Sequence, residues 1–212
     1  MGSAPLKRLI IEWTEGNPFF MEEMVQALFE QGVLARNGAV KLVKPLSEIR
    51  VPPTVQAILA SRIDRLPAAE KELLQTLAVL GREFPLGLIK RVAGKSDDEL
   101  ERMLSALQLA EFIYEQPAMG DIEYQFKHAL TLEVAYNPVL VERRRLLHEC
   151  AGQAIQSLYA GRLEDHLSEL AHHYDRSRNV RKAVEYLGRA GWRRSRRPIP
   201  RLPVISKEHL SC

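Results

Sequence analysis

The stretch that decides the fold is Trp13-Thr14-Glu15-Gly16-Asn17-Pro18-Phe19-Phe20, because three helix-start signals follow one another in it. Gly16 allows a backbone turn that other residues resist. Asn17 can accept hydrogen bonds from the free N–H groups of a first helical turn, and Pro18 suits the first helical position. Apolar side chains then recur at helical spacing. We therefore predict a rigid elbow, formed by residues 16–18, that leads into a helix over about 18–31.

The elbow also has the features of a ligand site. A proline exposed beside a helix start offers an apolar surface to a flat ring, and the free amides of the first turn attract an anion. A second interpretation needs no ligand, because the same residues make a well-capped helix start and short motifs often match by chance. The local spacing leaves both interpretations open.

Downstream of this helix, Asn37-Gly38 stands between two short apolar runs, which is a strong signal for a β-hairpin. Thr54 is placed to cap a further helix that ends before Pro67. We assign residues 1–66 to one helical region that contains the elbow and the hairpin.

Residues 67–128 predict three helices followed by two strands, over 112–116 and 122–126, that a loop connects. This order is typical of a winged-helix domain, whose third helix normally enters the DNA major groove. Here that helix begins with carboxylates at Asp97, Asp98 and Glu99, which would face phosphates. DNA binding through this helix is therefore disfavoured.

Residues 129–190 form a third helical region, with a break expected near Asn137-Pro138 because proline disfavours a helical residue before it. Helices over 163–176 and 179–190 combine small and aromatic residues in a way that resembles a tetratricopeptide-type unit. Such units stack on neighbours and bind protein partners. The Arg- and Pro-rich residues 191–212 are predicted to be poorly ordered.

Composition narrows the class of protein. The 212 residues carry a formal net charge of +3, which does not indicate a nucleic-acid binder, and 46% apolar residues can form a core. The two distant cysteines fit a reducing compartment. We see neither a signal peptide nor a run of about 18 apolar residues for a membrane helix. The cytoplasm is the expected location.

The sequence holds no phosphate-binding loop and no other catalytic constellation, so we expect this chain not to be an enzyme. We expect no metal site either, because adjacent helical residues such as His172 and His173 point about 100° apart. His128 stands where a strand meets a helix, and its imidazole could donate to an anion. The alternative is that His128 caps the helix or packs against the wing.

The motifs together resemble one family, the STAND-class signalling ATPases, over about residues 10–190. The resemblance is carried by TEGNPFFMEE (14–23), VPPTVQA (51–57), SRIDRLP (61–67), AVLGREF (78–84), YQFKHAL (124–130), RRRLLH (143–148) and LAHHY (170–174).

This resemblance implies roles for four residues. The family's elbow closes over the adenine of ADP or ATP, and it matches Gly16, Asn17 and Pro18. The histidine at the end of the family's winged helix senses the β-phosphate, and His128 occupies the similar place. Relatives often carry Met-His-Asp there, whereas this chain has Lys127-His128-Ala129.

The expected fold is thus mainly α: a helical lid (1–66), a winged helix with a small β-hairpin wing (67–128), the start of a tetratricopeptide-like array (129–190) and a tail (191–212). The family's phosphate loop would lie upstream, in a nucleotide-binding domain that contacts this chain in cis. ADP or ATP would then bind the full-length parent, with no tight binding to this chain alone. The alternatives are a stand-alone protein-interaction module and a DNA-binding winged-helix regulator.

Overall fold

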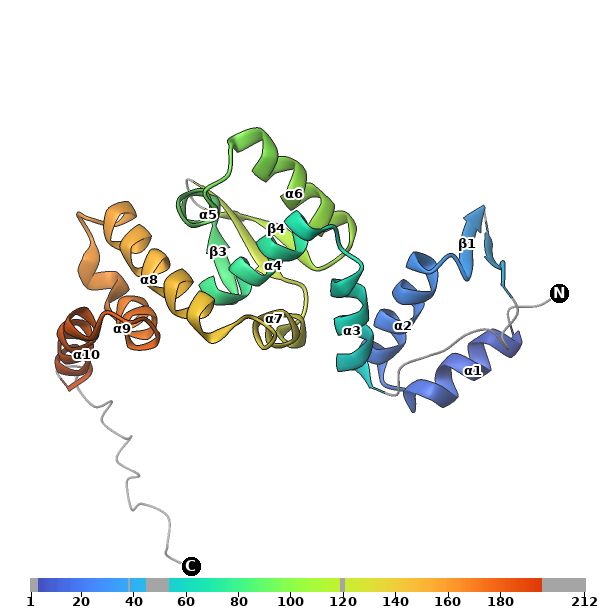
Figure 1. The fold of residues 1–212 in the computed structure, drawn as a ribbon. Helices are drawn as coiled ribbons and strands as arrows, with labels where there is room; N and C mark the ends of the chain where they lie inside the picture. The colour runs from blue at the N-terminus through green and yellow to red at the C-terminus, as the bar shows by residue number, and fades with distance from the viewer. Residues whose placement is uncertain (1–3, 38, 45–53, 119–120, 196–212) are drawn as a thin grey trace, which may run out of the picture. The chain divides into compact units, whose positions relative to one another are not determined.

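The computed structural model describes residues 4–37, 39–44, 54–118 and 121–195, and it confirms a mainly helical chain with a small antiparallel sheet (Figure 1). Two compact units divide the chain, a first unit up to Leu147 and a second unit from His148. The boundaries that we placed at 66/67 and 128/129 both fall within the first unit.

The first unit begins with helices that pack around an apolar cluster. Its elements here are α1 (Ala4–Thr14), α2 (Pro18–Glu30), β1 (Leu34–Asn37), β2 (Ala39–Leu42) and α3 (Val55–Asp64). Met24, Ala27 and Leu28 of α2 are buried together with Ile10 of α1 and Ile58 of α3. The predicted hairpin is present, with Asn37 paired to Ala39 across the turn.

Helices and a three-stranded sheet make up the rest of the first unit: α4 (Ala68–Leu80), β3 (Glu83–Pro85), α5 (Leu86–Ala93), α6 (Asp97–Leu109), β4 (Ile113–Ala118), β5 (Asp121–Phe126) and α7 (Ala129–Tyr136). The strand order is β3-β5-β4, and both pairs are antiparallel. The sequence did not predict β3, because three residues are too few to show a period. Phe84 of β3 is fully buried and meets Phe126 of β5 edge-on at 5.5 Å.

The expected break near Asn137-Pro138 is present, since α7 ends at Tyr136 and α8 (Val141–Leu158) begins four residues after Asn137. Asn137 nevertheless keeps helical angles, and its N–H still donates to Glu133 O. The helix break is therefore not caused by an effect of proline on the backbone angles of the preceding residue. Pro138 has no N–H to continue the helical hydrogen bonds, and this accounts for the break.

The second unit combines the C-terminal part of α8 with the 3₁₀ helix η2 (Leu163–His166), α9 (Leu167–Arg176) and α10 (Val180–Ser195). The expected pair of packed helices is present as α9 and α10. The helix α10 extends to Ser195 and so includes the first five residues of the tail that the sequence analysis placed at 191–212. Residues 196–212 lie outside the described part of the chain.

Aromatic rings hold the second unit together. Tyr174 of α9 stacks on Tyr186 of α10, with ring centroids 5.4 Å apart and an interplanar angle of 11°. The Tyr174 ring also lies against Gly152 of α8, where an added Cβ would come within 2.8 Å of Tyr174 Cζ. Gly152 is therefore required by close packing between α8 and α9.

Gly152→Ala is expected to destabilise the second unit by about 1–3 kcal/mol, because the ring must move out of its place between two neighbours. Gly188→Ala is the matched control, since nothing lies within 4 Å of its added Cβ. At this exposed helical position, Gly188→Ala should raise the free energy of unfolding by up to about 1 kcal/mol. Urea unfolding of both variants measures the difference, and equal effects would show that the Tyr174 contact imposes no constraint.

Candidate functional site

The elbow has the conformation that its residues predict. The backbone leaves α1 through two left-handed residues, Glu15 at φ +51° and Gly16 at φ +76°. Gly16 N donates to Ile11 O at 3.2 Å and closes the helix end. Asn17 Oδ1 then accepts from the N–H of Phe20 at 3.1 Å, and Pro18 is the first residue of α2.

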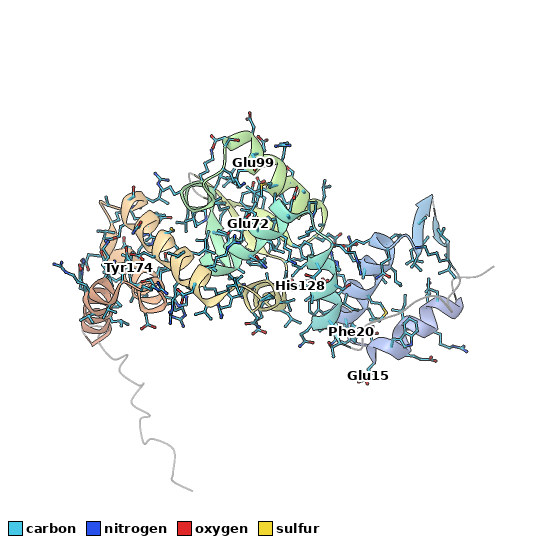
Figure 2. The ribbon with its side chains drawn as sticks, in the orientation of Figure 1. Glu15, Phe20, Glu72, Glu99, His128 and Tyr174 are labelled. Carbon is cyan, nitrogen blue, oxygen red and sulfur yellow. The ribbon has the colours of Figure 1, made fainter. Side chains whose placement is uncertain are left out.

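The elbow is open to a ligand. Gly16, Asn17 and Pro18 are all exposed, and no heavy atom lies within 4 Å of a Cβ placed on Gly16. Figure 2 shows this region with Glu15 and Phe20 labelled at the junction of α1 and α2. The proline ring is thus free to receive a flat group from solvent.

His128 lies close to the elbow, because its ring packs on the ring of Phe19 with centroids 4.1 Å apart and an interplanar angle of 44°. It occupies the N-cap position of α7, yet its side chain makes no capping hydrogen bond. His128 Nε2 is buried and has no hydrogen-bond partner among the described residues. Glu22 Oε2 lies 3.7 Å from this nitrogen. The ring thus packs on Phe19 of α2, whereas the alternative interpretation placed it against the wing, and its Nε2 is covered without a hydrogen bond.

Lys127, the residue before His128, joins α2 to the end of β5. Its ammonium donates to Glu111 Oε2 at 2.7 Å and also to Glu22 Oε1. Burial lowers the pKa of Lys127, but the hydrogen bonds to these two carboxylates raise it by more, so the net shift is upward. The hydrogen bond from Lys127 in turn holds the pKa of Glu22 below its ordinary value. Lys127 and Glu22 are therefore a charged pair at neutral pH.

A buried arginine ties α2 to the rest of the first unit. Arg62 of α3 is 2% exposed, and its Nη1 donates to the carboxylate of Glu23, which is 3% exposed. Arg62 Nε donates to Glu30 Oε1 at 2.8 Å, and Nη2 donates to Ala110 O at 2.6 Å. The guanidinium also lies 4.7 Å from the ring centroid of Phe112. We call these residues the Arg62 cluster.

Within this cluster, burial raises the pKa of Glu23, and the charge of Arg62 opposes that rise. Removal of either partner would therefore leave the other as an unpaired buried charge, which strongly destabilises a fold. Both residues lie in motifs that carry the family resemblance. The sequence did not predict that they form an ion pair, because 39 positions separate them along the chain.

An open groove of about 610 Å³ runs along α2 beside this region, lined by Met21, Glu22, Val25, Gln26, Phe29 and Glu111. None of the four predicted site residues lines it. Glu22 lines the groove and also lies beside His128.

Two histidines of the second unit, His148 and His173, form a buried pair. His148 Nδ1 and His173 Nδ1 are 3.0 Å apart, which requires one ring to donate and the other to accept. Burial, with smaller contributions from His148, His172 and Arg176, lowers the pKa of His173 from 6.5 to about 3. Across the residues with described positions, no three His, Cys, Asp or Glu side chains gather in a geometry that could hold a metal ion.

Comparison with protein-family models gives no match, and comparisons with curated proteins and with solved structures give none either. None of the helices in the described ranges combines the length and the hydropathy that crossing a bilayer requires.

Proposed function

We propose that this chain is a non-catalytic, regulatory part of a STAND-type signalling ATPase, in which it forms the lid and switch over an adenine nucleotide. The observation that carries the proposal is the contact between Phe19 and His128. It brings the exposed Pro18 and an imidazole nitrogen without a partner into one neighbourhood, although 110 positions separate them (128 − 18).

Each predicted residue has a role in this proposal. Pro18 would receive the adenine ring, and Gly16 and Asn17 would set the turn that presents it. His128 Nε2 would donate to a phosphate oxygen, as a protonated or suitably tautomeric imidazole can. A nucleotide that contacts both places stabilises only the arrangement that brings them together, which is the requirement for a ligand-driven switch.

The architecture supports the same assignment. In residues 67–128, the order of helices and the β3-β5-β4 sheet fit a winged-helix domain. In the second unit, the α9–α10 pair with its stacked tyrosines fits a tetratricopeptide-like unit. The phosphate-binding domain would be supplied upstream in cis, so ADP or ATP would bind the full-length parent tightly and this chain weakly.

A second candidate function is protein interaction through the helical repeat region. Along α10, Val180, Val184 and Leu187 recur at helical spacing and are 72%, 67% and 48% exposed. Exposed apolar stripes of this kind are typical of partner contacts. This function is compatible with the first, because it uses residues of the second unit.

DNA binding is disfavoured by the surface of α6. Asp97, Asp98 and Glu101 are exposed on this helix, and Asp98 and Glu101 line a hollow together with Leu109. A helix that enters the major groove should present cations to the phosphates instead.

Titration of the ¹⁵N-labelled chain with ADP and with duplex DNA at several salt concentrations tests the proposal. We expect ADP to shift the amide signals of Gly16, Asn17 and His128, with a weak Kd, and DNA to leave α6 unchanged. DNA binding that weakens steeply with salt would favour the winged-helix regulator. In the full-length parent, ADP binding unaffected by Pro18→Ala and His128→Ala would contradict the lid assignment.

A further inference from the structure

Glu22 lies beside the two basic residues that follow β5, Lys127 and His128. One carboxylate oxygen accepts a hydrogen bond from Lys127, and the other lies 3.7 Å from His128 Nε2. The carboxylate therefore spans Lys127 and His128 in the way that two oxygens of a phosphate group could.

The two carboxylates that contact Lys127 disfavour the binding of a further anion beside them. Glu22 and Glu111 place two carboxylates on one ammonium, so the summed charge of these three groups is negative. A phosphate would be repelled from His128 unless one carboxylate moved away.

Glu22 can move away from His128, because its side chain is 45% exposed on the surface of α2 and can turn toward solvent without disturbing the core. The side chain of Glu111 is exposed to a similar degree, 47%, but the carboxylate that lies beside His128 is that of Glu22. The neighbouring Glu23 is its opposite, because its side chain is 3% exposed and bonded to Arg62. Glu22 and Glu23 are adjacent on α2 but differ in mobility: Glu23 is held by Arg62, whereas Glu22 can be displaced.

We infer that Glu22 is an internal anion that occupies the phosphate position at His128, and that Lys127 is a further phosphate ligand that becomes available when Glu22 swings away. The inference rests on the proposed function for the identity of the ligand, a nucleoside diphosphate. It adds two residues, Glu22 and Lys127, and it makes their ion pair the contact that a ligand must replace.

The test uses inorganic pyrophosphate as the probe and the His128 imidazole and amide NMR signals of the 212-residue chain as the readout. Glu22→Gln should lower the Kd by about fivefold, since partly exposed ion pairs are weak and their removal has a modest effect. Lys127→Met should raise the Kd above that of the unaltered chain. Glu133→Gln, an exposed position on α7, is the control with the same change in net charge.

The inference is overturned if Glu22→Gln and Glu133→Gln bind pyrophosphate equally, if Lys127→Met binds as the unaltered chain does, or if the His128 signals shift in none of the proteins. Circular dichroism of each variant establishes that the fold is kept before the Kd values are compared.

A parallel titration with ADP separates this inference from the proposed function. If the pyrophosphate results are as expected but ADP binds no more tightly and Pro18→Ala has no effect, the adenine site fails while the role of Glu22 stands. If ADP binding requires Pro18 but Glu22→Gln changes nothing, the proposed function stands and this inference fails.

Discussion

Arg62→Ala is expected to lower the free energy of unfolding of the first unit by about 3–5 kcal/mol, because removal of one partner of a buried ion pair leaves an uncompensated charge. Glu23 would stay buried without its cation, and Ala110 O would lose its donor. Urea unfolding, followed by hydrogen exchange in peptides from α2 and α3, measures the loss and locates it in this unit.

Two further variants show whether the effect comes from the buried pair. Arg65→Ala removes an exposed arginine from the end of the same helix, whose contacts are Ser61 Oγ at 2.6 Å and Glu30 Oε2 at 3.7 Å. Its expected effect is about 0–1 kcal/mol. The double variant Arg62→Met with Glu23→Leu should recover much of the stability, since apolar replacement of both partners is often neutral. Equal losses for Arg62→Ala and Arg65→Ala would contradict this account of the cluster.

Acidification should destabilise the second unit by about 1.4 kcal/mol for each pH unit below 6.5, through His173. The folded state lowers the pKa of His173 from 6.5 to about 3. The unfolded chain therefore binds the proton first as the pH falls. This stabilisation is fully present above pH 6.5 and is lost progressively toward pH 3.

His173→Gln removes this titrating group, and it should reduce the dependence of stability on pH between 6.5 and about 5, above the range in which ordinary carboxylates titrate. A smaller dependence should remain from His172, because burial lowers its pKa as well. His166→Gln is the control, since this half-buried ring stacks on Tyr159 at 3.7 Å outside the His148–His173 pair. Thermal unfolding across this pH range distinguishes the two variants. A pH slope in His173→Gln as steep as that of the unaltered chain would assign the acid sensitivity to another group.

The sequence predicted best what neighbouring residues decide. The capping roles predicted for Asn17 and Thr54 are confirmed, because each signal lies within three residues of the N–H that it satisfies. The strand β3 was not predicted, because it is short and is stabilised by pairing with β5. The last turn of α10 was not predicted either, because an Arg-rich pattern has no apolar period that would indicate a helix.

The candidate site was harder to predict, since its contacts join distant parts of the chain. Glu22 and Lys127 are 105 positions apart, and no local spacing relates them. At Lys127 the sequence shows only a departure from the Met-His-Asp pattern of the family that it resembles. The proximity of His128 to the elbow is an expectation from that resemblance alone, and the apolar spacing places Phe19, which makes the contact, on a helix face.

Photo-crosslinking with 8-azido-ADP, followed by peptide mapping, tests the central claim most directly, because the reactive group sits on the adenine ring. We expect the label on the peptide that contains Gly16 to Phe20, with the yield reduced by excess ADP and by Pro18→Ala. Labelling that falls elsewhere in the chain, or that neither excess ADP nor Pro18→Ala reduces, would contradict the assignment of the elbow as an adenine site.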